Sequence, residues 1–216
     1  MIIIGELINS TREIIKNKIL KKDKKYIQEI AKQQEDAGAD YIEVNAGEFI
    51  KKEEKILSWL VKTVQKVVEI PLSLDSANPE ALSQALKLVD KVPIINSIKE
   101  EKTRYSQVIP LIKKYNTKVI ALCMDDQGIS ENVNKRLNIS KNMICNLRKE
   151  GIKDKNIFID PLLRPISINT GYGVKVLKLK EKINKKYSKI NITCGLSNIS
   201  HGMPQRSLLN QSFLIM

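Results

Sequence analysis

The chain has 216 residues, of which 42% are hydrophobic and 28% charged, with 9 Gly and 7 Pro. This composition excludes collagen-like, low-complexity and disordered chains and predicts a globular protein with a sizeable core, which we expect to be one domain over residues 1–216. Lys and Arg number 37 against 24 Asp and Glu, a net charge of +13. Because the lysines are scattered over helix faces, we expect no nucleic-acid partner.

Short β-branched runs alternate with helical patterns along the whole chain, which is typical of βα units and a parallel sheet. In chain order we expect strand 2–8, helix 24–37, strand 41–44, helix 52–68, strand 72–74, helix 79–89, strand 92–95, helix 103–114, strand 118–124, helix 133–149, strand 157–159, helix 174–185, strand 190–193 and helix 204–216. These make seven βα units, one fewer than a closed (β/α)₈ barrel has.

Two helix starts have specific signals. Asp23 is an expected N-cap, and Asn78, Pro79 and Glu80 supply an N-cap, a first-turn proline and a first-turn acid. Gly151 is expected to end the helix over 133–149.

Polar residues lie at or near the end of every expected strand: Glu6, Asn9, Glu43, Asn45, Asp75, Asn96, Asp125, Asp160 and Asn198. In a (β/α) barrel all strand ends meet on one face, where active sites form, whereas a doubly wound sheet concentrates ligand binding at one crevice. We therefore favour a TIM-type barrel over a doubly wound sheet. Each such residue taken alone is more often a helix cap or turn residue than a functional one.

Asp75 and Asp160 follow apolar strand sequence, so each carboxylate needs a partner rich in hydrogen-bond donors. Carboxylates accept hydrogen bonds only, while Asn side chains both donate and accept, and the combination suits a flat heterocycle such as the edge of a pterin. Without a compact Asp/Glu cluster in the sequence, we expect no metal.

Three cysteines, Cys123, Cys145 and Cys194, form no CxxC pair and indicate a reducing cytoplasm. The sequence shows no secretion signal and no apolar run long enough to span a membrane, so no membrane association is expected. His201 and the cysteines are weak catalytic candidates, because nothing basic lies beside the thiols and a single loop histidine is usually solvated.

Six segments carry a family likeness, and their sequences are GELINSTR (5–12), ADYIEVNAG (39–47), PLSLDSANPEAL (71–82), IINSI (94–98), IDPLLRPIS (159–167) and GLSNISHGMPQRSLLNQSFL (195–214). Together they resemble the methyltetrahydrofolate:corrinoid protein methyltransferases, which are related to the folate domain of methionine synthase and to dihydropteroate synthase. The resemblance implies a pterin-binding (β/α)₈ barrel, a homodimer, and methyl transfer between N5 of methyltetrahydrofolate and the cobalt of a cobalamin (corrinoid) carried by a partner protein.

The resemblance also assigns residues. Asp75, Asn96 and Asp160 match pterin-binding groups, Asn198 matches the asparagine that contacts N5 and is the catalytic candidate, and Arg206 resembles a residue near the aminobenzoyl-glutamate tail. The remaining candidates for the polar cup are Glu6, Asn9, Asn45 and Asp125.

The chain departs from the family pattern in three places. Asp125 stands where some relatives have Asn, and Arg164 with the SHGMP loop is closer to the branch that serves methoxyaromatic or methylamine demethylation. The chain also ends within the seventh helix, so we expect the eighth βα unit to be missing. Two alternatives stay open: an enzyme like dihydropteroate synthase, and a non-catalytic module that docks a corrinoid protein.

Overall fold

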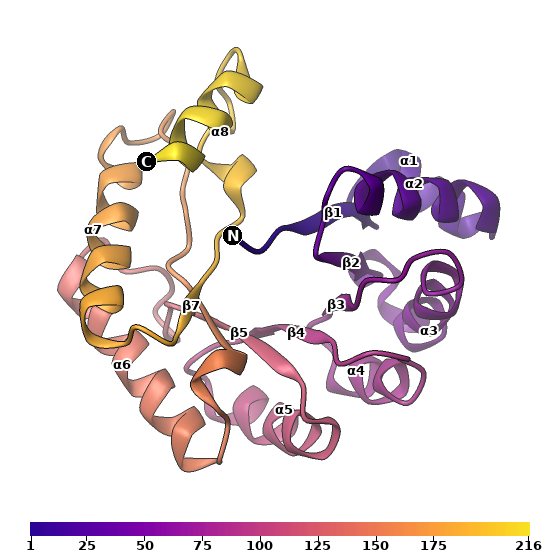
Figure 1. The fold of residues 1–216 in the computed structure, drawn as a ribbon, viewed down its shortest axis with the longest axis horizontal. Helices are drawn as coiled ribbons and strands as arrows, with labels where there is room; N and C mark the ends of the chain where they lie inside the picture. The colour runs from indigo at the N-terminus through magenta and orange to yellow at the C-terminus, as the bar shows by residue number, and fades with distance from the viewer. The chain divides into compact units, whose positions relative to one another are not determined.

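The computed structural model describes residues 1–216, apart from the side chain of residue 102. Strands and helices alternate along the chain (Figure 1). The strands are β1 (Ile4–Asn9), β2 (Tyr41–Asn45), β3 (Leu72–Asp75), β4 (Ile94–Ile98), β5 (Lys118–Leu122), β6 (Ile157–Asp160) and β7 (Asn191–Ile192). The α-helices are α1 (Glu13–Leu20), α2 (Lys24–Asp36), α3 (Glu53–Val64), α4 (Pro79–Leu86), α5 (Lys102–Tyr115), α6 (Val133–Lys149), α7 (Gly171–Lys186) and α8 (Arg206–Ile215). Three 3₁₀ turns are η1 (Gly47–Lys52), η2 (Asp154–Asn156) and η3 (Leu196–Asn198).

The strands follow one another in the sheet in their sequence order, from β1 to β7. The pairs β1–β2, β2–β3, β3–β4 and β6–β7 are parallel. A doubly wound sheet reverses its strand order at a switch point, whereas a (β/α) barrel does not. The expected α/β fold with seven parallel βα units is therefore confirmed, and its strand order is that of a barrel.

The chain divides into two compact units. Unit 1 comprises residues 1–97 and 106–119, and unit 2 comprises residues 98–105 and 120–216. In unit 1, Ile42, Val44 and Leu74 on the strands and Leu57 and Leu60 on α3 are fully buried. Burial of five such side chains removes much apolar area from water and holds the helices on the strands.

Unit 2 has its own apolar cluster. Leu163, Val176 and Ile199 form its buried centre, and Ile166, Cys194 and Phe213 pack against them. The loop after β6, helix α7 and the loop after β7 therefore share one small core, and this core fixes the loops that follow two of the strands.

The caps predicted from the sequence are present. The Asp23 carboxylate accepts a hydrogen bond from the Tyr26 amide (3.1 Å), and the Asn78 side chain accepts from the amides of Glu80 (2.9 Å) and Ala81 (3.4 Å). Gly151 has a φ of +83° after α6, in the left-handed region that glycine adopts without strain. Each cap satisfies backbone groups that the helix itself leaves unpaired.

Two sequence predictions of local structure are wrong. Helix α1 was not expected, because its apolar pattern in the sequence is short. In the structure only Ile15 and Ile19 of its eight residues are buried. The fourth strand was expected over 92–95 but is Ile94–Ile98. The carbonyl group of Pro93 accepts from the Lys118 amide (3.0 Å), and because proline lacks an N–H it pairs less well within a strand than the residues after it. Asn96 therefore lies inside β4 rather than after it.

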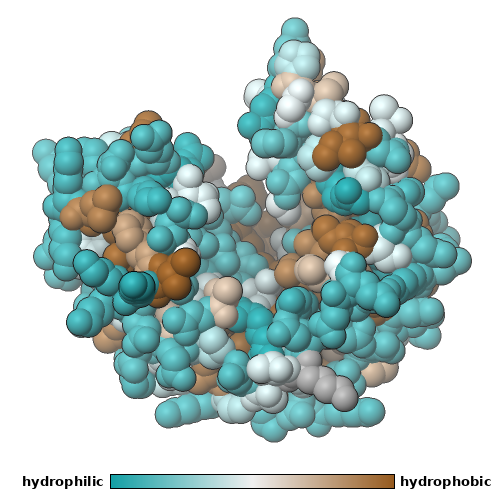
Figure 2. Space-filling model, turned by 180° about the vertical axis from the view of Figure 1, so that it is seen from behind, coloured by the Kyte–Doolittle hydropathy of each residue, from teal (hydrophilic) through white to brown (hydrophobic). Residues whose placement is uncertain are grey.

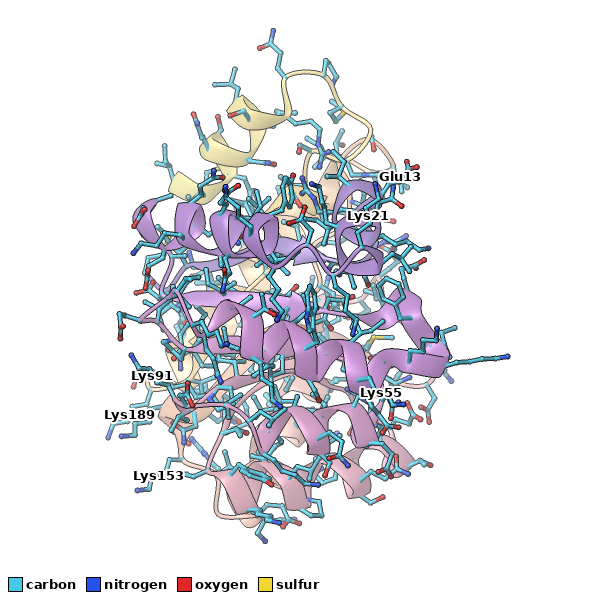
Figure 3. The ribbon with its side chains drawn as sticks, turned by 90° about the vertical axis from the view of Figure 1, so that its right-hand side faces the viewer. Glu13, Lys21, Lys55, Lys91, Lys153 and Lys189 are labelled. Carbon is cyan, nitrogen blue, oxygen red and sulfur yellow. The ribbon has the colours of Figure 1, made fainter. Side chains whose placement is uncertain are left out.

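The surface is mainly hydrophilic. Figure 2 shows a face that is mostly teal, with separate hydrophobic patches. The labelled Lys91, Lys153 and Lys189 extend outward from the ribbon in Figure 3. Within the part of the chain that the structure describes, no helix is both long and apolar enough to cross a membrane.

Candidate functional site

The carboxyl ends of the first four strands carry a row of polar residues. Asn9 pairs in register with Asn45, Asn45 with Asp75, and Asp75 with Asn96. Register partners on adjacent strands place their side chains on the same face of the sheet. The sequence prediction that these strand ends meet is thus confirmed for the four residues of unit 1.

The side chain of Asn45 has a fixed orientation. Its Nδ2 donates to Oδ2 of Asp75 (2.8 Å), and its Oδ1 accepts from the Ser10 hydroxyl and from the Gly47 amide (both 2.9 Å). Because these contacts bring a donor to the oxygen side and an acceptor to the nitrogen side, the amide cannot flip without losing them. Asn45 therefore holds the Asp75 carboxylate in place.

Glu43 forms a second polar pair with Asn96, nearer the middle of β2 than Asn45. It precedes Asn45 by two residues and so lies on the same face of β2, where it is only 4% exposed. The Asn96 Nδ2 donates to its Oε2 (2.8 Å). Burial, followed by the negative charges of Asp75 and Glu6, raises the pKa of Glu43 to about 8, although the hydrogen bond from Asn96 opposes the shift. Burial and the neighbouring negative charges therefore favour the protonated form of Glu43.

Glu6 on β1 completes an acidic group with Glu43 and Asp75. Partial desolvation and the charge of Asp75 raise the pKa of Glu6 above its ordinary value. The buried Ser73, two residues before Asp75 on the same strand face, has a hydroxyl that contacts no hydrogen-bond partner in the described part of the chain. We refer to Glu6, Glu43, Asn45, Asp75 and Asn96 as the acidic cluster.

The acidic cluster is rich in acceptors. Asn45 and Asn96 each use one of their two Nδ2 N–H groups within it, so the cluster offers a ligand carboxyl oxygens and the Asn96 oxygen together with the second N–H of each Asn. The oxygens fit a ligand edge that carries several N–H donors, such as the amino and ring N–H groups of a pterin. Among the described residues, no group of His, Cys, Asp and Glu has the arrangement of a metal site.

Asn9 has a different local role from the other members of its row. Its Oδ1 accepts from the amide (3.0 Å) and the hydroxyl (2.8 Å) of Thr11. Asn9 therefore closes the turn between β1 and α1, as Asn commonly does.

In unit 2, Asp160 is the last residue of β6 and shapes the loop that follows. Its Oδ1 accepts from the Leu162 amide (2.7 Å), and Leu162 has a φ of +60°. A left-handed conformation is unfavourable for leucine and needs such support from neighbouring groups. Asp160 thus stabilises the loop after β6.

The other three predicted residues of unit 2 lie in loops or at an element end. Asp125 forms an ion pair with Lys135 (2.9 Å), which holds the pKa of Asp125 below its ordinary value. Asn198 is exposed at the end of η3, and its backbone N–H donates to the Gly195 carbonyl group (3.1 Å). Arg206, at the start of α8, donates to the Ser200 hydroxyl (3.2 Å) and to the Ser197 carbonyl group (3.0 Å). Arg206 thereby ties α8 to the loop after β7.

Sequence reasoning noted Glu43 near the end of its strand but did not include it among the site residues. A single glutamate within a strand is usually a solvated residue. The available signal was its spacing, because Glu43 and Asn45 share a strand face with an apolar sequence around them.

Comparison with known proteins decides the family. The family model described as "Pterin binding enzyme" matches residues 5–212. The chain belongs to this family. This pterin-binding enzyme is 35% identical over 216 residues to a methylcorrinoid:tetrahydrofolate methyltransferase of Eubacterium limosum. The match covers 99% of this chain and 80% of the relative. It is 25% identical to the methionine synthase of Mycobacterium leprae, covering 99% of this chain but 19% of that protein.

Solved structures agree on the fold of this pterin-binding enzyme. A dihydropteroate synthase from Xanthomonas albilineans in complex with 7,8-dihydropteroate has a TM-score of 0.70 at 14% identity, covering 99% of this chain and 82% of that one. The resemblance identified from the six sequence segments is confirmed, and so are the barrel-type fold and the expectation of an enzyme of one-carbon transfer.

Proposed function

We propose that this chain moves a methyl group between N5 of methyltetrahydrofolate and the cobalt of a corrinoid held by a partner protein. The observation that carries the proposal is the acidic cluster, whose fixed acceptors match the donor edge of a pterin, in a chain that matches a methylcorrinoid:tetrahydrofolate methyltransferase over 99% of its length. The buried Ser73 hydroxyl adds a further unsatisfied polar atom on the same strand face.

In this proposal the acidic cluster binds and orients the pterin. Asp75 presents to the ligand a carboxylate that Asn45 holds in position, and Asn96 presents its oxygen because its nitrogen donates to Glu43. Holding one reactant in place replaces part of the entropy of a bimolecular encounter. The sequence resemblance assigns Asp160 to the same ligand, and it assigns Arg206 to the neighbourhood of its tail.

The difficult step is departure of the folate amine. The reduced cobalt supplies the nucleophile, the N5–methyl bond breaks with its electron pair left on N5, and N5 takes up a proton from solvent. A hydrogen bond to N5 that strengthens as this bond breaks lowers the barrier, and the Asn198 amide is the donor proposed for it. The reverse transfer uses the same groups.

An assay of the purified chain tests this function. The chain is mixed with methyltetrahydrofolate and free cob(I)alamin, and the absorbance of cobalt(I) is followed. Catalysed loss of the cobalt(I) spectrum supports methyl transfer. Formation of dihydropteroate from a dihydropterin diphosphate and p-aminobenzoate, with no loss of cobalt(I), would instead identify a synthase. Binding of a corrinoid protein with neither reaction would identify a docking module.

The proposal also covers the domain organisation, the oligomeric state and the cellular location of the chain. We propose that residues 1–216 act as one pterin-binding domain, that the chain forms a homodimer and that it works in the cytoplasm with its three cysteines reduced. The cysteines are free in the structure. Analytical ultracentrifugation measures the oligomeric state, and a monomer at micromolar concentration would contradict the dimer.

A further inference from the structure

A pocket of about 390 Å³ lies on the helical side of unit 1 and shares no lining residue with the acidic cluster. Its walls come from α2, from α3 with the residues that follow it, and from the loop after α4. Helices α2 and α3 pack side by side there (Figure 3). Pockets that hold small organic ligands usually have about 300–1,000 Å³. The pocket therefore has room for one small molecule other than the pterin.

Hydrogen bonds fix the walls of this pocket on both sides of α3. Gln28 Nε2 on α2 donates to the Thr63 carbonyl group (3.1 Å). Gln65 Nε2 donates to the Leu88 carbonyl group (2.7 Å), and Gln65 Oε1 accepts from the Asp90 amide (3.3 Å). Two glutamine side chains thus tie α3 to its neighbours. Because the walls are held in place without a ligand, little ordering is needed when a ligand binds.

The lining of the pocket is cationic. Lys24, Lys62 and Lys66 are exposed, and in the part of the chain that the structure describes their ammonium groups form no ion pair. By contrast, Lys32 on α2 pairs with two carboxylates of its own helix. Asp90 is the one acid among the described lining residues, so the three lysines leave the lining with a net charge of +2. The pocket therefore attracts an anion with about two negative charges.

A phosphate monoester matches this lining better than a single carboxylate does. Its charge is about −1.5 to −2 at neutral pH, whereas a carboxylate carries one negative charge. Lysine binds phosphate as a point charge, while planar recognition of carboxylates is the usual role of arginine. The described lining has three lysines and no arginine.

Trp59 gives the pocket an aromatic wall. It is the one tryptophan of the chain, and it lies half-buried on α3. Its Nε1 is buried with no hydrogen-bond partner among the described atoms, so no hydrogen bond of the indole fixes the ring in one orientation. Aromatic side chains bind flat ligand rings, such as nucleic-acid bases, by stacking. The pocket thus combines a stacking surface with three cations.

We propose that this pocket binds a small aromatic phosphate with the size and chemistry of a nucleoside monophosphate. The ligand ring stacks on Trp59, and the phosphate is held by Lys24, Lys62 and Lys66. The Asp90 carboxylate accepts a hydrogen bond from a hydroxyl or amino group of the ligand. The pocket shares no residue with the proposed folate site, so this proposal does not depend on methyl transfer.

The single tryptophan also reports on the pocket, because all tryptophan fluorescence of the chain comes from Trp59. The purified chain is titrated at low salt with AMP, phenyl phosphate, adenosine and inorganic phosphate. We expect AMP to change the fluorescence saturably and to bind at least about tenfold more tightly than adenosine or inorganic phosphate, since each of these offers one half of the ligand. Phenyl phosphate as tight as AMP would show that a ring and a phosphate suffice, and weaker binding of phenyl phosphate would identify a nucleotide.

Lysine variants test the phosphate contacts. Lys62→Gln and Lys66→Gln should each weaken AMP binding by about threefold to tenfold and leave the affinity for methyltetrahydrofolate unchanged. Lys55→Gln is the matched control, because it removes an exposed lysine of α3 that does not line the pocket. Circular dichroism confirms that each variant is folded.

Three results would overturn the proposal. Fluorescence changes that do not saturate with AMP or phenyl phosphate would show that the pocket binds neither. AMP binding that Lys62→Gln and Lys66→Gln weaken no more than Lys55→Gln does would show that the lysines are only solvated. Equal affinity for AMP and inorganic phosphate would show an adventitious ion only, with no part for the aromatic ring.

Discussion

Glu43 and Asn96 are joined by a hydrogen bond of 2.8 Å although they lie on β2 and β4, which are separated in the sheet by β3. Ser73 on the intervening strand is the register partner of Glu43. Its small side chain leaves room for the Glu43–Asn96 hydrogen bond to cross β3. The pair links non-adjacent strands and sets the direction in which the Asn96 amide points. It also places a carboxyl group where water barely reaches it.

Stability should fall as the pH rises, because of Glu43. The pKa of Glu43 is raised from the ordinary 4.5 to about 8 in the folded chain, so between these values the folded chain binds more protons than the unfolded one. By linkage, the contribution of this group to the free energy of unfolding then decreases with pH across that window. Glu43→Gln should remove this pH dependence and be more stable than the wild type at pH 8 by on the order of a few kcal/mol. Urea unfolding at pH 5, 6.5 and 8 measures the effect.

Glu54→Gln provides the control for this prediction, since it changes an exposed glutamate on α3. It should leave the pH slope of stability unchanged. A Glu43→Gln variant with the same slope as the wild type would show that Glu43 is ionised at neutral pH and would contradict the account of the acidic cluster.

Asp75 should contribute mainly to folate affinity. Asp75→Ala removes an acceptor that Asn45 holds in position, so we expect folate binding to weaken by about 1–3 kcal/mol, the range for charged hydrogen bonds left unmade. Isothermal titration calorimetry measures the loss. Unchanged affinity would remove Asp75 from the pterin site, whereas the fold should survive the substitution because Asp75 is at the end of its strand.

The limits of sequence prediction follow from the same residues. Asn78, Pro79 and Glu80 identified the start of α4 because a cap depends on a few adjacent residues. The row from Asn9 to Asn96 was predictable because each member ends or nearly ends a strand in a parallel fold. The Glu43–Asn96 bond was not predictable, since it depends on strand register and on a small residue at position 73. The burial of Arg136 also was not predictable, because α6 carries several basic residues and its sequence does not distinguish the buried one.

Gly5 should be sensitive to a single added methyl group. A Cβ atom there would lie 2.6 Å from Oε1 and 3.1 Å from Cβ of Gln34, whose side chain accepts from the Leu7 amide. Gly5→Ala should therefore cost about 1–3 kcal/mol in the free energy of unfolding, as overpacking does. Combining it with Gln34→Ala should recover part of the loss. A double variant less stable than Gly5→Ala, measured by chemical denaturation, would show that the close contact is relieved in another way.

Asn198 should affect the rate more than affinity. A donor that assists only the departing amine acts in the transition state, so Asn198→Ala should slow methyl transfer by roughly 10²–10³ while folate affinity changes much less. Stopped-flow absorbance of cobalt(I) gives the rate, and equilibrium titration gives the affinity. If both quantities fall by the same factor, Asn198 is a binding residue. If neither changes, the match of Asn198 to the family's asparagine has no functional meaning.

The central claim is that this chain transfers a methyl group from a folate that the acidic cluster binds. Its most direct test uses methyltetrahydrofolate with a ¹³C-labelled methyl group, cob(I)alamin and catalytic amounts of the chain, with the label followed by NMR. We predict that the label leaves N5 and appears on the cobalamin with the wild-type chain, and at a much lower rate with Asp75→Ala when the folate is below saturation. A label that stays on N5 although the wild-type chain binds the folate would contradict the claim.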